Sequence, residues 1–167
     1  MSVSATEPDW SRERPRRWWD PSRRLLRAIR RYQAARGPLA PLARKYWVLQ
    51  HRFWSVVTQA DIPLDTVIGG GLMLPHPNGI VIHPNTRIGP NCMIFHQVTL
   101  GTRPAQPVAP RIGGHVDIGA GAKILGNVSV GDHARIGANA VVLSDVPAGA
   151  TVVGIPARIL KEASETA

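Results

Sequence analysis

A six-residue repeat of aliphatic side chains constrains the fold of this chain more than any other feature. The repeat slips by two residues once, and it later skips one whole unit before it resumes in phase. A glycine follows many of these positions directly, and a small or apolar residue recurs four places after them. The aliphatic positions are Ile62, Ile68, Leu74, Ile80, Ile82, Ile88, Ile94, Leu100, Ile112, Ile118, Ile124, Val130, Ile136 and Val142.

Such a period is typical of a solenoid, and a hexapeptide period is typical of a parallel β-helix. Each unit is expected to form one short strand and one turn, and three units to close one triangular coil. The aliphatic side chains then point inward and stack from coil to coil. The glycines are expected at the corners, where a side chain would clash or where φ is positive. The sequence therefore predicts a mainly β fold, with the repeat domain at residues 61–160.

The basic charge is confined to the part of the chain before the repeats. Residues 1–60 hold 13 Lys or Arg and 4 Asp or Glu, whereas the remainder is balanced. All five tryptophans lie in the same segment. Helical spacing predicts one helix over residues 22–36, with Asp20 and Pro21 at its start, and a second over 39–58. Residues 1–20 are expected to be loosely ordered. We therefore divide the chain into a basic, Trp-rich helical arm (1–60), the repeat domain (61–160) and a polar tail (161–167).

The arm has three alternative roles. An amphipathic cap on the repeat domain is the simplest. A weak contact with an acidic membrane surface also fits basic residues mixed with aromatics. Nucleic-acid binding is not expected, because no nucleic-acid motif is present. No apolar run has the length of a membrane-spanning helix. The single cysteine, Cys92, occupies an inward repeat position, which indicates an inert core thiol and a reducing cytoplasm.

Two irregular segments interrupt the repeat. Residues 102–110 contain three prolines and no repeat pattern, which indicates a loop extruded at one corner. The segment Pro75-His76-Pro77-Asn78-Gly79 comes just before the two-residue slip. Irregular backbone on a rigid scaffold is where binding groups usually lie. Because a triangular coil has flat faces, we also expect a homotrimer, or a dimer of trimers, with sites at the subunit boundaries.

The candidate chemical groups are histidines. No HExxH, CxxC, GxSxG or P-loop motif is present, so a zinc site or an activated serine is poorly supported. His76 lies between two prolines where the repeat slips, and His96 follows one coil later. A carbonic-anhydrase-like metal enzyme with His76, His83 and His96 as ligands is a remote alternative.

Several segments together resemble the serine O-acetyltransferase family of hexapeptide acyltransferases. They are GGGLMLPHPNGIVIHPNTRIG, QVTLGT and IGGHVDIGAGAKILGNVSVGDHARIGANAVVLSDVPAGATVVGIPARIL, which cover about residues 60–160. The resemblance implies a left-handed parallel β-helix and direct transfer of acetyl from acetyl-CoA to a hydroxyl, without a metal. It also implies that His76 is the general base and that Asp61 orients it. A neutral imidazole suits this role near pH 7, and a carboxylate on its far nitrogen stabilises the imidazolium.

The resemblance also implies where the two substrates lie. Acetyl-CoA is expected along the coil edges, at Thr99, Gly101, Ala120, Lys123, Ala138 and Arg158. Lys123 and Arg158 would meet its phosphates. Backbone N–H groups near Gly101 would stabilise the oxyanion.

The acceptor site departs from the family pattern. Val108 and Ala109 replace an Arg-His pair that binds serine in longer members, and Pro75 replaces an acidic residue. Arg103, Arg111 and His96 are therefore the candidate acceptor-binding residues. Members that dock into a sulfhydrylase use a C-terminal isoleucine, whereas this sequence ends in alanine, so that docking is not expected.

The sequence therefore predicts an acetyl-CoA-dependent O-acetyltransferase of the cytoplasm, with L-serine as the acceptor and O-acetyl-L-serine as the product. Two other functions remain open. One is O-acetylation of a sugar or a polysaccharide precursor, and the other is a non-catalytic β-helix that serves as a binding module.

Overall fold

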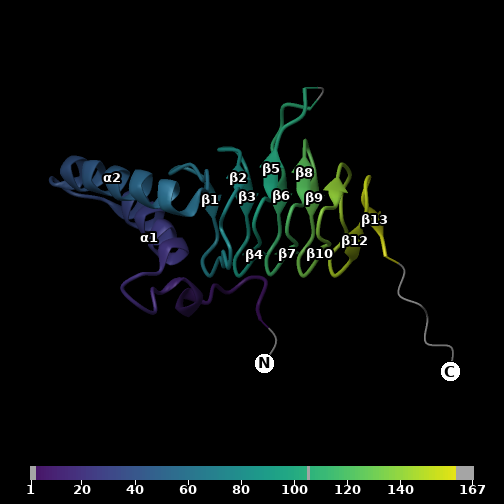
Figure 1. The fold of residues 1–167 in the computed structure, drawn as a ribbon, viewed down its shortest axis with the longest axis horizontal. Helices are drawn as coiled ribbons and strands as arrows, with labels where there is room; N and C mark the ends of the chain where they lie inside the picture. The colour runs from purple at the N-terminus through teal and green to yellow at the C-terminus, as the bar shows by residue number, and fades with distance from the viewer. Residues whose placement is uncertain (1–2, 105, 161–167) are drawn as a thin grey trace.

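The computed structural model describes residues 3–104 and 106–160, so the predicted polar tail lies outside the described residues. Two helices stand at one end of a solenoid of short strands (Figure 1). The chain winds through three parallel sheets, visiting them in the same order in each coil. The mainly β fold predicted from the repeat is thus confirmed.

Sheet 1 contains β1, β3, β6 and β9, sheet 2 contains β2, β5, β8 and β11, and sheet 3 contains β4, β7, β10, β12 and β13. All neighbours are parallel except β12 and β13, which pair antiparallel at the C-terminal end. The strands are β1 (Val67–Ile68), β2 (Val81–Ile82), β3 (Arg87–Ile88), β4 (Met93–Ile94), β5 (Thr99–Gly101), β6 (Arg111–Ile112), β7 (Asp117–Ile118), β8 (Lys123–Leu125), β9 (Ser129–Val130), β10 (Arg135–Ile136), β11 (Val141–Val142), β12 (Thr151–Val153) and β13 (Arg158–Ile159).

The strand register confirms the coil length and both irregularities. Val81 pairs with Thr99, eighteen residues later, as three six-residue units require. Asp61 pairs with Val81 across twenty residues, because the two-residue slip lies between them. Thr99 pairs with Lys123 across twenty-four residues, because the loop at 102–110 is extruded without disturbing the register. Figure 1 shows this loop projecting between β5 and β6.

The aliphatic repeat positions form the core of the solenoid. All fourteen are buried, and so are the small or apolar residues four places after them. Full burial of an aliphatic side chain stabilises a fold by about 1.5–3 kcal/mol, so the stack is the main source of stability. Cys92 belongs to this stack, and its Sγ donates to the Gly113 carbonyl at 3.1 Å. Burial raises the pKa of the Cys92 thiol to about 11, which agrees with an inert core residue.

The close stacking of coils at the corners between sheet 1 and sheet 3 explains why glycine follows the aliphatic residue there. A Cβ on Gly69 would lie 2.4 Å from the Pro90 nitrogen of the next coil, so close stacking of the coils requires glycine there. Positive φ is needed two residues later, where Gly71 has φ +82° and Asn91 has φ +60°. The glycine directly after the aliphatic residue therefore serves packing between coils.

The helices are α1 (Pro21–Ala34) and α2 (Ala40–Thr58), close to the predicted bounds. Helix α1 buries an apolar face, which contains Leu25, Leu26, Ala28 and Ile29. Helix α2 buries only Trp54 and Thr58. Of the five apolar side chains whose spacing predicted α2, Val57 packs partly buried against the core, whereas the other four are more than half exposed; these are Leu42, Tyr46, Leu49 and Phe53. Among the helices that the structure describes, none has the length and apolar character needed to cross a bilayer.

The expectation that residues 1–20 are loosely ordered is wrong for the described residues 3–20. This segment contains a 3₁₀ helix, η1 (Trp10–Glu13), and lies along the corner between sheets 1 and 3. The buried side chain of Asn91 holds it: Oδ1 accepts from Asp9 N–H at 2.8 Å, and Nδ2 donates to the carbonyls of Ser4 and Glu7. Side-chain bonds of this kind have no periodic signature in the sequence.

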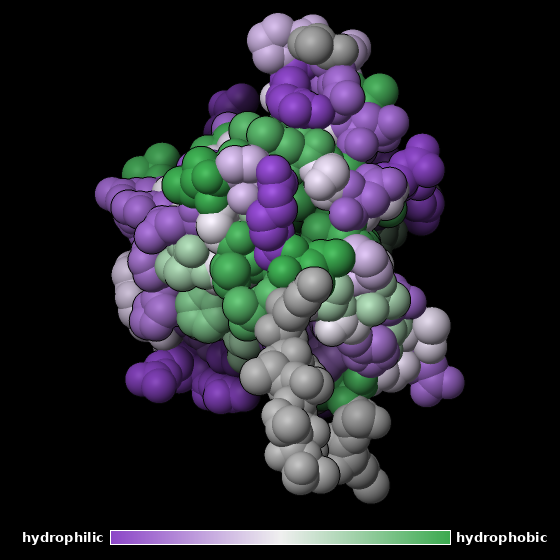
Figure 2. Space-filling view, turned by 90° about the vertical axis from the view of Figure 1, so that its right-hand side faces the viewer, coloured by the Kyte–Doolittle hydropathy of each residue, from purple (hydrophilic) through white to green (hydrophobic). Residues whose placement is uncertain are grey.

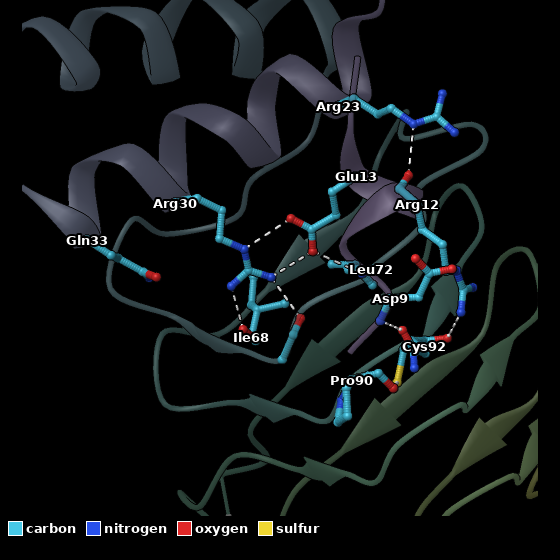
Figure 3. Close-up of polar contacts among 12 residues, drawn as sticks. Asp9, Arg12, Glu13, Arg23, Arg30, Gln33, Ile68, Leu72, Pro90 and Cys92 are labelled. Atoms are coloured by element: carbon cyan, nitrogen blue, oxygen red, sulfur yellow. Dashed lines mark hydrogen bonds and ion pairs between the residues drawn. The ribbon is translucent and has the colours of Figure 1, made fainter. Parts of the chain in front are cut away.

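A buried ion pair links η1, α1 and the first coil (Figure 3). Glu13 accepts two bonds from the Arg30 guanidinium, at 2.8 and 3.1 Å. Its carboxylate also accepts from Leu72 N–H at 3.0 Å. Arg30 in turn donates to the carbonyls of Ile68 and Gly69. The arm is thus fastened to the solenoid through charge-assisted bonds, which are stronger than neutral ones.

The C-terminal end of the solenoid carries apolar surface (Figure 2). Strand β13 turns back against β12 there, and the end coil has no further coil to stack on within the described residues. Its exposed apolar residues are Val153, Ile155, Ile159 and Leu160.

Candidate active site

His76 and His96 lie at the same corner, between sheet 3 and sheet 2, in successive coils. Their ring centroids are 6.3 Å apart, with the rings nearly perpendicular. His76 is exposed on the irregular segment before the slip, whereas His96 is half-buried. Within the described residues, the Nδ1 atom of His96 is buried and has no hydrogen-bond partner. The corner thus presents one accessible imidazole beside a second with an unused polar atom.

His76 lines a pocket with a volume of about 640 Å³. One wall is the segment Pro75–Asn78, and another is the end of α2 with Gln59. The third wall is formed by residues 16–23 of the arm, which were not expected to contribute. The lining residues are Arg16, Arg17, Trp19, Asp20, Pro21, Ser22, Arg23, Val57, Thr58, Gln59, Pro75, His76, Pro77 and Asn78.

Asp61 lies one coil before His76 and next to its segment. The backbone of Asp61 bonds Ile80 and Ile82, and Gln59 accepts from Gly79 N–H at 2.8 Å. The Asp61 side chain is exposed, and no hydrogen bond joins it to His76 among the described residues. The orienting role of Asp61 therefore stays a prediction.

Four of the residues expected to bind acetyl-CoA follow His76 along the same side of the solenoid. Thr99 and Lys123 pair in sheet 2. Ala120 and Ala138 lie at the corner, where Asn139 N–H donates to the Ala120 carbonyl at 2.8 Å. The Lys123 ammonium bonds the Gln97 carbonyl, so it is tied to the neighbouring coil in this state.

The other two expected acetyl-CoA residues lie at the ends of strands. Gly101 ends β5, where the loop leaves the coil, and Arg158 is exposed on β13 at the C-terminal end. All six residues are thus distributed from the His96 coil to the last coil. Their contact with acetyl-CoA stays a prediction.

The two arginines expected to hold the acceptor do not lie with His76 in one chain. Arg103 bonds Gln106 inside the extruded loop. Arg111 lies on sheet 1 and lines a different pocket, together with Val108 and Ala109. Their part in acceptor binding stays a prediction that requires a neighbouring copy of the chain.

The residues that sequence reasoning missed are Arg16 and Arg17. Both are exposed, and both line the His76 pocket from the arm. The triple glycine at 69–71 was the available signal, because a Cβ on Gly70 would lie 2.7 Å from the Trp10 ring. Such a run indicates that another segment approaches the corner closely.

The three histidines proposed as metal ligands in the carbonic-anhydrase-like alternative do not form a cluster. His83 lies away from the other two histidines, where its Nδ1 accepts from Asn85 N–H at 3.2 Å. Among the described residues, no group of three or more His, Cys, Asp or Glu has the arrangement of a metal site.

Comparison with known proteins shows which proteins this chain is similar to. The family described as "Bacterial transferase hexapeptide (six repeats)" matches residues 109–144. The serine acetyltransferase of Buchnera aphidicola subsp. Schizaphis graminum is 45% identical over 117 residues, which cover 68% of this chain and 44% of that protein. The serine acetyltransferase of Mycobacterium tuberculosis is 40% identical over 110 residues, which cover 65% of this chain and 48% of that protein. The chain thus spans a little under half the length of these relatives.

Solved structures of serine acetyltransferases match a larger share of the chain. A serine acetyltransferase in complex with CoA superposes with a TM-score of 0.71 at 35% identity, covering 86% of this chain and 58% of that one. Serine acetyltransferase from Brucella abortus strain S19 superposes with a TM-score of 0.69 at 35% identity, covering 85% and 55%. These matches extend beyond the repeats into the helical arm, because the repeat domain alone is a smaller share of the chain.

The repeats and the family match define a hexapeptide-repeat transferase. Within that class, the chain belongs to the serine O-acetyltransferase family, as the resemblance of its motifs implied.

Proposed function

We propose that this chain is an acetyl-CoA-dependent serine O-acetyltransferase, which converts L-serine to O-acetyl-L-serine for cysteine biosynthesis. The observation that carries the proposal is the position of His76, which is exposed, lines a pocket of about 640 Å³ and lies beside the edge expected to hold acetyl-CoA. The relatives' names and the CoA-bound neighbour support the same reaction. A left-handed coil, the handedness of the family, is part of the proposal.

His76 acts as the general base. Its neutral imidazole takes the hydroxyl proton while the acceptor oxygen attacks the thioester carbonyl carbon. The tetrahedral oxyanion then collapses, the carbon–sulfur bond breaks, and the CoA thiolate takes the proton back from His76. Asp61 orients the imidazole and stabilises its cationic form. No covalent enzyme intermediate is required, so the buried Cys92 has no part.

The assembly is proposed to be a homotrimer, with a dimer of trimers as the larger form. Exposed valines support it: Val67 and Val81 lie on flat faces, and Val108 lies in the extruded loop. A neighbour's extruded loop would then bring Arg103 towards the His76 pocket, and the strand that follows the loop would bring Arg111. Light scattering tests this assembly: a mass near three times 18.1 kDa is expected, and a monomer at micromolar concentration would contradict it.

We further propose that the arm makes weak contact with anionic membranes. Residues 21–60 contain nine Lys or Arg and no Asp or Glu, beside the exposed apolar face of α2. An amphipathic helix with this composition favours the surface of an acidic bilayer. Like charge opposes pairing of two such arms, which favours lipid over a second copy. A cytoplasmic location is proposed on the single reduced cysteine.

A thiol-release assay with acetyl-CoA tests the reaction. L-serine is expected to release CoA faster than homoserine or neutral sugars. O-acetylation of a sugar in preference to serine would favour the alternative function. No thiol release with any acceptor, despite binding of acetyl-CoA, would favour the non-catalytic binding module.

A further inference from the structure

The pocket of His76 is lined by more positively charged than negatively charged side chains. Its charged lining residues are Arg16, Arg17 and Arg23 with a single carboxylate, Asp20. Arg23 is already satisfied: Nη1 pairs with Asp20 at 3.1 Å, and Nε donates to the Arg12 carbonyl at 2.9 Å. Two arginines of the arm are therefore left facing the pocket.

Asp20 does not neutralise these two arginines. Its Oδ2 accepts from Arg16 N–H at 3.0 Å and from Arg23. Burial raises the pKa of Asp20, but these bonds outweigh it and hold the pKa below its usual value. The carboxylate is thus charged and committed to Arg23 and the backbone. Within the described residues, the guanidinium groups of Arg16 and Arg17 make no hydrogen bond or ion pair.

The segment that carries the two arginines is fastened at both ends. Glu13 bonds Arg30 and Leu72 on one side. On the other side, the Trp19 ring packs edge-on against Trp54, with the centroids 5.6 Å apart. Arg16 and Arg17 therefore belong to a fastened segment that lines the same pocket as His76 (Figure 3 shows the fastening at Glu13).

A carboxylate on the acceptor would complete this arrangement. Arginine is the side chain best suited to bind a carboxylate, because its planar donors match the two oxygens. Val108 and Ala109 stand where the resemblance implies an Arg-His pair, and neither side chain can pair with a carboxylate. From these contacts, and on the basis of the function proposed above, we infer that Arg16 and Arg17 bind the carboxylate of the hydroxyl acceptor and determine acceptor specificity.

Carboxylate-bearing hydroxyl compounds come from two sources, amino acids and acidic sugars. The test therefore uses two matched pairs as acceptors: L-serine against L-serinamide, and glucuronate against glucose. We expect the acid of at least one pair to be preferred 10- to 100-fold in kcat/KM, the usual value of a hydrogen bond to a charged group. The pair that shows the preference identifies the source of the carboxylate.

Three variants connect this preference to the arm. Arg16→Gln and Arg17→Gln should each raise the KM of the preferred acid about 10-fold or more, with the Kd of acetyl-CoA unchanged. Arg14→Gln is the matched control, because Arg14 is exposed on the same arm and lines a different pocket. It should leave both parameters unchanged.

Titration calorimetry with L-serine, L-serinamide, glucuronate and glucose, in the presence of CoA, measures binding without the reaction. Loss of acid binding in the Arg16 and Arg17 variants supports the inference even if turnover is low. Equal use of acid and neutral acceptors would overturn it, and so would an effect of Arg111→Gln without one of Arg16→Gln or Arg17→Gln. Weaker acetyl-CoA binding in the two variants would also overturn it. Absence of thiol release with every acceptor, with acid binding intact, would contradict the proposed function alone.

Discussion

Replacing Glu13 by glutamine removes the charge that fastens the arm while it keeps the side-chain shape. Glu13 is 8% exposed and its partner Arg30 is 20% exposed, so the pair is largely out of water. Breaking a buried pair costs about 3–5 kcal/mol, because the remaining charge is uncompensated. Arg30 keeps its bonds to two carbonyls and some solvent, which places the expected loss of unfolding free energy lower, at about 2–3 kcal/mol.

Urea unfolding at one fixed protein concentration measures this loss, since association changes apparent stability. Glu7→Gln is the matched control, because Glu7 is an exposed carboxylate of the same segment whose side chain makes no bond among the described residues. It should change the free energy by less than about 0.5 kcal/mol. A loss for Glu13→Gln no larger than for this control would refute the reasoning that the ion pair holds the arm on the solenoid.

Three further outcomes are expected. Cys92 should not react with a thiol reagent until the protein unfolds, because the thiol is buried and its pKa is raised to about 11; immediate stoichiometric reaction would contradict its core position. Asp61→Asn should lower turnover less than His76→Ala does, as an orienting group should, and a larger loss would assign the proton transfer differently. The double variant Leu42→Ser, Leu49→Ser should weaken sedimentation with anionic vesicles about 10-fold or more, since two exposed apolar residues lose about 1 kcal/mol each; neutral vesicles are the control, and unchanged anionic binding would remove α2 from the membrane contact.

The periodic part of the structure was predictable from the sequence, because one side-chain pattern sets both burial and register. The spacing of Ile62, Leu100 and Ile112 predicted the coil length, the slip and the extruded loop, and the register bears this out. His76 and His96 are one coil apart in the sequence, and the structure places their ring centroids 6.3 Å apart.

The rest of the site was not predictable, because it depends on contacts between distant and non-periodic segments. Asn91 holds the backbone of residues 4–9 through its amide, and Glu13 reaches Leu72 across fifty-nine residues. Neither contact changes the local pattern around it, so residues 3–20 were interpreted as loosely ordered. For the same reason, the sequence did not indicate that Arg16 and Arg17 line the pocket of His76.

Steady-state kinetics of His76→Ala, with acetyl-CoA affinity measured on the same protein, test the account most directly. General acid–base catalysis contributes about 10²–10⁴-fold, so turnover should fall by that factor. The Kd of acetyl-CoA should stay within about two-fold of the wild-type value, because His76 contacts the reacting hydroxyl and not the coenzyme. Near-normal turnover of His76→Ala would contradict direct acetyl transfer through this histidine.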